Sequence, residues 1–179
     1  MQAKGEQVLF QETQRFRQPW LVALLCVIVV TTIGVFGYGM SQQLVLGRPW
    51  GDRPMSDLAL MLVGSASILL VSGIAYLLYA ARLITEVCPD ALYLRFFPLT
   101  QRRISWSEVT SCEARTYRPV REYGGWGIRV GRSGMAYNVS GNRGVQLELR
   151  RGKALLIGSQ RAKELASVIE GVLQRSQGR

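Results

Sequence analysis

The sequence predicts a membrane α-hairpin followed by an α+β domain that is mainly β, a small barrel or sandwich with a C-terminal capping helix. Three observations carry this prediction: two long uncharged stretches in the first half, short alternating runs after them, and one amphipathic stretch at the end. Hydrophobic residues make up 48% of the chain although its net charge is +10. The apolar residues are therefore concentrated, which excludes a disordered chain and a simple soluble globule.

The first uncharged stretch covers residues 19–39. A helix of about 21 residues spans about 30 Å, the thickness of a bilayer's hydrocarbon core. Trp20 and Tyr38 lie near its ends, where aromatic side chains favour the membrane interface. A cleaved signal peptide is the competing interpretation, but Glu6 and Glu12 precede the stretch, and it is too long for a signal sequence. We therefore expect a retained span.

The second uncharged stretch covers residues 58–81 and is followed by Arg82. Its length argues against a buried core helix and for a second span. Small residues recur along it at every seventh position, and this spacing places them on nearly one helix face: Ala59, Ala66, Gly73 and Ala80. Such a stripe lets two helices approach closely. It either packs against the first span or forms a seam between copies of the chain.

Basic residues predict the orientation of the spans. The tail of residues 1–18 holds three of the 22 Lys and Arg residues, the loop of residues 40–57 holds two, and the other 17 follow the second span. By the positive-inside rule, both termini are cytoplasmic and the short loop is external. Residues 82–179 then form a cytoplasmic domain.

The N-terminal tail is not a random polar segment. Leu9, Thr13 and Phe16 recur at helical steps, whereas Val8, Phe10 and Phe16 fit an alternating strand. The tail therefore either lies in the membrane interface or pairs with the cytoplasmic domain.

Residues 82–179 have the pattern of a β-rich domain with one terminal helix. Turn residues separate short alternating runs, which predict about seven strands in meander order, with residues 118–125 as a loop. Ser159 is a suitable N-cap for the helix that follows. One face of that helix is apolar: Ala162, Leu165, Ala166, Ile169, Val172 and Leu173. These elements predict a small antiparallel barrel or bent sandwich capped by the helix.

Four segments of this domain resemble bacterial membrane proteins that carry a pleckstrin-homology-like (PH-like) domain after two spans. They are VCPDALYLRF, RRISWSEV, GVQLELRRGKALLIGS and RAKELASVIEGVL. The resemblance covers residues 82–175 and implies a PH-like fold, an inner-membrane location and membrane-associated binding or scaffolding. Eukaryotic relatives of the fold often bind phosphoinositides through a basic turn in the first hairpin. The corresponding turn here, Pro89-Asp90, is acidic.

The sequence lacks residues that several classes of protein function require. The chain has no histidine, which removes the commonest general base and metal ligand. Cys26, Cys88 and Cys112 share no CxxC spacing, so neither a zinc site nor a disulfide framework follows. The spans hold no ionisable residue to mark a transport path, and no strand has the pattern of an RNA-binding sheet. We expect a non-catalytic protein without metal, cofactor or nucleic-acid partner.

The arginines of the domain are the candidate binding residues, because guanidinium groups pair bidentately with phosphates and carboxylates. The domain holds 17 basic and eight acidic residues, and the candidates among them are Arg102, Arg103, Arg118, Arg121, Arg129 and Arg132. Besides the bilayer, the main expected partner is another membrane-associated protein or a second copy of the chain, in a scaffold role. Alternatives are binding of anionic lipid headgroups through the basic face, and assistance in assembling a larger membrane complex.

Overall fold

A computed structural model describes residues 7–131, 134–150, 152 and 154–177 of the chain. The chain divides into two compact units, and one is inserted into the other. Residues 17–80 form a helical unit, whereas residues 1–16 and 81–179 together form a β unit.

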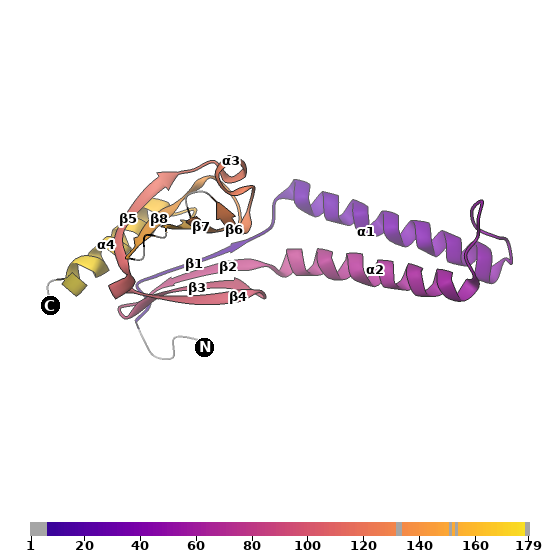
Figure 1. The fold of residues 1–179 in the computed structure, drawn as a ribbon, viewed down its shortest axis with the longest axis horizontal. Coiled ribbons are helices and arrows are strands. Elements are labelled where there is room, and N and C mark those ends of the chain that lie inside the picture. Colours follow the sequence, from indigo (N-terminus) through magenta and orange to yellow (C-terminus); the bar gives the residue numbers. More distant parts are fainter. Residues whose placement is uncertain (1–6, 132–133, 151, 153, 178–179) are drawn as a thin grey trace. The chain divides into compact units, whose positions relative to one another are not determined.

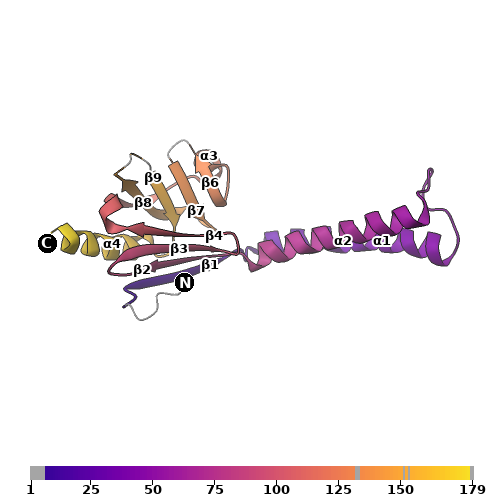
Figure 2. The ribbon, with the colours of Figure 1, turned by 60° about the horizontal axis from the view of Figure 1, so that its bottom comes forward.

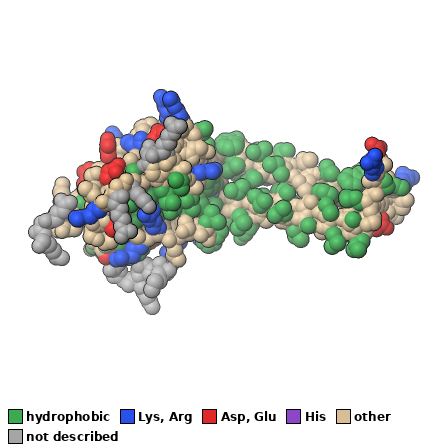
Figure 3. Space-filling model, in the orientation of Figure 1, with side chains coloured by type: hydrophobic (Ala, Val, Ile, Leu, Met, Phe, Trp, Pro, Cys, Tyr) green, Lys and Arg blue, Asp and Glu red, His purple; other side chains and the backbone are tan. Residues whose placement is uncertain are grey.

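The helical unit consists of two helices and a loop (Figure 1). Helix α1 (Pro19–Met40) continues as a π-helical turn (Ser41–Val45), and helix α2 covers Asp57–Ala80. Both helices are long and apolar enough to cross a membrane, and almost none of their residues is buried within the unit. Figure 3 shows apolar side chains along the visible face of both helices and charged side chains at the loop end. The predicted spans agree with these helices within a few residues.

Helices α1 and α2 pack closely at Gly64. A Cβ added there would lie 2.5 Å from Met40 Cε and 3.1 Å from Phe36 Cδ1 of α1. Two members of the predicted small-residue stripe, Ala66 and Gly73, are instead exposed. Apart from its own turns of α2, no described part of the chain lies within 4 Å of a Cβ added at Gly73. The other two members are half-buried: Ala59 and Ala80. Within this hairpin, the close approach therefore depends on a glycine outside the stripe.

The side chains of Trp50 and Gln43 attach the loop between the helices to α1 and α2. The indole of Trp50 meets the Phe36 ring edge-on, with ring centroids 6.4 Å apart. Gln43 Nε2 donates hydrogen bonds to the Met55 carbonyl oxygen at 2.7 Å and to Asp57 Oδ1 at 2.8 Å. These bonds tie the end of α1 to the beginning of α2.

The β unit begins with the N-terminal segment, which forms strand β1 (Phe10–Arg15) rather than an interfacial helix. Sheet A has the order β1-β2-β3-β4 and is antiparallel throughout. Its other strands are β2 (Arg82–Val87), β3 (Ala91–Phe97) and β4 (Thr100–Ser105). Figure 1 shows β1 beside β2, although the whole helical unit separates them in the sequence.

Sheet B has the order β5-β8-β9-β7-β6. Its strands are β5 (Val109–Thr116), β6 (Gly127–Gly131), β7 (Gly134–Asn138), β8 (Arg143–Leu149) and β9 (Ala154–Gly158). The predicted meander is wrong here, because β5 pairs with β8 and β7 runs parallel to β9. Alternation fixes which face of a strand is buried but not which strand lies beside it. The predicted loop also contains a short helix, α3 (Pro119–Tyr123).

Helix α4 (Ala162–Gln177) completes the β unit and contacts β5 and β8. Figure 2 shows strands β6 to β9 as a layer distinct from β1 to β4. Buried residues of both sheets and α4 form one apolar cluster, and all six predicted apolar positions of α4 belong to it. The observed α+β architecture of two mostly antiparallel sheets with a C-terminal helix therefore agrees with the prediction at this level.

Strand β1 also contacts the last residue of β9 in sheet B. The amide of Gln14, itself buried, donates a 2.7 Å hydrogen bond to the Gly158 carbonyl oxygen. The ring of Phe10 is buried in the main core, and the Arg161 guanidinium lies 4.5 Å from its centroid. The first strand of the chain is thus part of the sandwich rather than an appendage.

Glu12 connects β1 with the segment that leads into α4. Its carboxylate accepts hydrogen bonds from the hydroxyl of Ser159 and, at 2.9 Å, from the backbone N–H of Gln160. A carboxylate near a helix N-terminus satisfies backbone donors and interacts favourably with the helix dipole. Arg161 adds a 2.6 Å hydrogen bond to the backbone carbonyl oxygen of Gln11.

We predict that Phe10→Ala lowers the free energy of unfolding by about 3–5 kcal/mol, because it removes a buried ring from the core. The measurement is urea unfolding of the full-length protein in a mild detergent, followed by tryptophan fluorescence. Val8→Ala, at a neighbouring exposed position, is the control and should change the value by less than about 0.5 kcal/mol. Equal effects of the two changes would contradict the placement of β1.

We also predict that Gly64→Leu destabilises the helical hairpin by about 1–3 kcal/mol, because the added side chain would overlap atoms of α1. Gly73→Leu adds the same side chain where there is open space, so it should leave the hairpin unchanged. Thermal unfolding of both variants in the same detergent separates these cases. A larger effect at Gly73 would show that the small-residue stripe carries the contact.

Candidate binding surface

Three of the predicted arginines lie on two adjoining elements, α3 and β6. Arg118 and Arg121 are exposed at the start and in the middle of α3, and Arg129 is exposed on β6. Val120 of α3, which is 67% exposed, accompanies them. Val130 is 78% exposed, but it is the residue next to Arg129 in β6 and therefore points to the other side of the strand. We call Arg118, Val120, Arg121 and Arg129 the α3–β6 surface. The sixth predicted residue of this region, Arg132, lies outside the described residues.

A small apolar cluster underlies α3. Tyr117 and Tyr123 are both buried, and their rings meet edge-on with centroids 6.0 Å apart. Ala136 of β7 and Leu156 of β9 complete this cluster, which is separate from the main core. Pro119 begins the helix and Gly124 ends it in the left-handed conformation, with φ of 72°. The exposed side chains of α3 therefore stand on a packed base.

Glu122 fixes the start of α3 by bridging two residues. Its carboxylate accepts a 2.6 Å hydrogen bond from the backbone N–H of Arg118. It also forms an ion pair with Arg115, in which Nη2 lies 2.8 Å from Oε2. The N–H of Arg118 lowers the pKa of Glu122, and the nearby Arg115 guanidinium lowers it further. Within the described part of the chain, the side chains of Arg118 and Arg121 make no ion pair. Their charges are thus available to a ligand.

Strand β6 is fixed through Asn138, which is fully buried. Its Oδ1 accepts a 2.9 Å hydrogen bond from the Gly127 N–H, and its Nδ2 donates to the Tyr117 hydroxyl at 3.1 Å. The Trp126 carbonyl oxygen accepts a 3.1 Å hydrogen bond from Arg129 Nε. The α3–β6 surface is therefore positioned by buried polar bonds as well as by packing.

Arg102 and Arg103 point to opposite sides of β4. Arg102 is half-buried and reaches β7, where its Nη1 lies 3.6 Å from Met135 Sδ. Arg103 lies on the outer side of sheet A, in an ion pair of 3.1 Å with Asp90. The structure therefore does not bring these two predicted site residues together.

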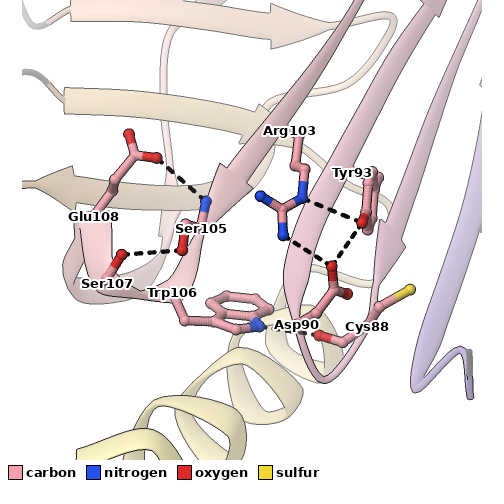
Figure 4. A network of polar contacts seen from close by, with 8 residues as sticks. All are labelled: Cys88, Asp90, Tyr93, Arg103, Ser105, Trp106, Ser107 and Glu108. Carbon is pink, nitrogen blue, oxygen red and sulfur yellow. Dashed lines mark hydrogen bonds and ion pairs between the residues drawn. The ribbon is translucent and has the colours of Figure 1, made fainter.

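Figure 4 shows that the first hairpin turn is closed by this ion pair. Arg103 Nε donates to the Tyr93 hydroxyl at 3.3 Å, and that hydroxyl donates to Asp90 Oδ2 at 2.7 Å. The hydrogen bond with Tyr93 raises the pKa of Arg103, and Asp90 adds to this effect. Because Arg103 already has an internal carboxylate partner, this turn is not arranged as an anion-binding loop.

The connection between β4 of sheet A and β5 of sheet B is a 3₁₀ turn (Trp106–Glu108), and Trp106 anchors it. The buried indole donates a 3.0 Å hydrogen bond to the Cys88 carbonyl oxygen (Figure 4). Ser105 and Glu108 cap the turn reciprocally. The RRISWSEV segment therefore has a structural role at the junction of the two sheets.

A second basic region lies between β5 and the start of α4, and sequence reasoning missed it. A hollow of about 480 Å³ is bordered there by basic side chains from three separate segments: Arg115, Arg143, Arg161 and Lys163. Two of them already have carboxylate partners, because Arg115 pairs with Glu122 and Arg161 pairs with Glu164 at 3.1 Å. The hollow is therefore less suited to a ligand than the α3–β6 surface.

The described residues contain no group of three or more His, Cys, Asp or Glu side chains that could hold a metal ion. Cys112 is half-buried, with its Sγ 3.7 Å from the Ala166 carbonyl oxygen. Burial, with the nearby charge of Glu170, raises the pKa of Cys112 to about 11. Its thiol is therefore protonated at neutral pH and is a poor nucleophile.

Comparison with known protein families gives a match over nearly the whole chain. A model described as "Family of unknown function (DUF6141)" matches residues 1–174, which include both the helical and the β unit. No curated protein matches the chain significantly.

We predict that Cys112 reacts slowly with iodoacetamide in the folded protein. A thiol of pKa about 11 is about 100-fold less ionised at pH 8 than one of pKa 9.0, and the thiolate is the reacting form. In a Cys26→Ser, Cys88→Ser variant, the alkylation rate measured by mass spectrometry should keep rising between pH 9 and about 11. Unfolding in urea should restore ordinary reactivity. A plateau near pH 9 in the folded protein would contradict the raised pKa.

Proposed function

The chain belongs to the DUF6141 family, whose function is unknown, and from its geometry we propose a non-catalytic integral membrane protein with a cytoplasmic PH-like domain. In this proposal the domain binds an acidic protein partner through the α3–β6 surface and serves as a membrane-attached scaffold. The observation that carries the proposal is the set of three exposed arginines, with the exposed side chain of Val120, on a packed base.

The membrane topology is supported by the β1–β2 pairing. These strands lie directly before α1 and directly after α2, and they pair over their whole length, from Phe10↔Val87 to Arg15↔Arg82. If α1 and α2 span a bilayer, both ends of the hairpin must lie on one side of it. The excess of basic residues in the β unit favours the cytoplasmic side, here of a bacterial inner membrane.

A protein partner suits the composition of the α3–β6 surface. Arginine is enriched in protein interfaces and among the residues that contribute most to binding. Because the α3–β6 surface carries three exposed arginines, its complement is an acidic surface. The packed base under α3 lowers the entropy that binding must remove, since few of these backbone groups need to become ordered.

Self-association through this surface is less favourable than binding a different protein. The domain holds 17 basic residues against eight acidic ones, so a second copy offers few carboxylates to three arginines. Anionic lipid headgroups are the main alternative ligand for the same arginines. The PH-like assignment is supported by the two sheets and the C-terminal helix that packs against them.

The test is native mass spectrometry of the full-length protein, purified in a mild detergent from its own membrane. We predict that the wild type retains a protein partner, whose occupancy falls about tenfold or more in Arg118→Glu/Arg121→Glu, because two favourable charge contacts become repulsive. The matched control, Arg143→Glu/Arg150→Glu, makes the same charge change at exposed positions elsewhere on the domain and should retain the partner.

Other outcomes would redirect or overturn the proposal. A monomer that carries anionic lipid, lost in Arg118→Glu/Arg121→Glu but kept in the control, would assign the α3–β6 surface to headgroups. A homo-oligomer that survives both double changes would place self-association on another surface. A bare monomer would overturn the scaffold role.

A further inference from the structure

The turn between β3 and β4 exposes two large apolar side chains of the β unit. Phe97 is 41% exposed and Leu99 is 70% exposed, on either side of Pro98. Exposed apolar side chains that lie close together in one turn commonly mark an interaction site.

The register of sheet A places this turn at the end of the sheet from which the chain leaves for α1 and returns from α2. Phe97 pairs with Arg82, and Arg82 pairs with Arg15. Arg82 follows the last residue of α2, Ala80, by two positions. Standard backbone spacings therefore keep the Cα of Phe97 within about 13 Å of that helix end. The interfacial layer of a bilayer leaflet is about 5–8 Å thick.

The same end of the sheet is cationic. Arg15 and Arg82 are directly opposite each other in the ladder, an arrangement that is unfavourable for like charges unless an anion lies between them. The described residues provide no carboxylate ion pair to either one. The Arg82 guanidinium lies 4.9 Å from the centroid of the Phe97 ring, and its Nε has no hydrogen-bond partner among the described residues.

We propose that the β3–β4 turn inserts Phe97 and Leu99 into the headgroup–acyl boundary of an anionic membrane, while Arg15 and Arg82 bind lipid phosphates. Apolar side chains next to exposed cations are the combination that binds this boundary. The inference rests on the proposed membrane topology but not on the proposed protein partner. It gives the β unit a second, lipid-facing surface that is distinct from the α3–β6 surface.

The test measures the immersion of a nitroxide attached at Leu99→Cys in the full-length protein. The background is Cys26→Ser, because Cys88 is buried and Cys112 is protonated at the labelling pH. The protein is reconstituted in phosphatidylethanolamine–phosphatidylglycerol vesicles, and collisions with oxygen and with a water-soluble nickel chelate are compared. Ser107→Cys, exposed beyond the opposite end of β4, is the matched control on the same unit. Val30→Cys, exposed within α1, reports on the span.

We predict that the nickel collision rate at position 99 is at least about fivefold lower than at position 107, because the label lies below the headgroups. Equal rates at 99 and 107, with a protected label at position 30, would overturn this inference and leave the topology intact. A label at position 30 that is accessible to nickel would overturn the membrane topology itself. Both labelled loop positions are exposed, so neither change is expected to prevent folding.

A second comparison tests the role of the arginines. In vesicles of phosphatidylcholine alone, which carry no net charge, nickel collisions at position 99 should at least double relative to the anionic vesicles. The double change Arg15→Gln/Arg82→Gln should remove this dependence on lipid charge. Identical immersion in both vesicle types would overturn the assignment of Arg15 and Arg82 to phosphates.

Discussion

The antiparallel ladder between β1 and β2 is the constraint on which the rest of the structure depends. These strands enclose the helical unit in the sequence, yet they are neighbours in sheet A. The β unit is therefore complete only when both ends of the hairpin meet. Joining two strands across a flexible loop of this length would cost about 4 kcal/mol in chain entropy. The packing of α1 against α2 at Gly64 reduces that cost, because it brings the ends of the loop together in advance.

Two parts of β1 have different roles. Midway along the strand, Glu12 joins β1 to the segment before α4, so the first strand also holds the C-terminal helix. At the end of the strand, sheet A presents Arg15, Arg82 and the apolar β3–β4 turn. The α3–β6 surface has its own apolar base around Tyr117, separate from the main core. Changes to its exposed arginines should therefore leave the fold intact.

The two long apolar helices and the apolar stripe of α4 were predictable, because an uncharged stretch of this length and an amphipathic helix each have a simple pattern in the sequence. Features that depend on partner choice were not. Alternation could not reveal the parallel pairing of β7 with β9. The regular spacing of small residues pointed to Gly73, whereas the contact uses Gly64. At the candidate site, the grouping of arginines on α3 and β6 was predictable from their proximity in sequence, and the separation of Arg102 from Arg103 follows from alternation in a strand. The ion pair of Arg103 with Asp90 was not predictable, because it depends on which strands lie side by side.

The position of β1 also has a consequence for biosynthesis. The ribosome makes this strand before either apolar helix, and its partner β2 emerges only after both helices have been translated. Until then, the backbone donors and acceptors of β1 have no ladder to join, and Gln14 and Glu12 lack the partners they find near α4. Closure of the sandwich thus requires that the whole hairpin has been made and that its two ends lie together. In the proposed membrane topology, a chain in which only one helix crossed the bilayer would hold β1 and β2 on opposite sides, and its β unit would stay open and exposed to proteases.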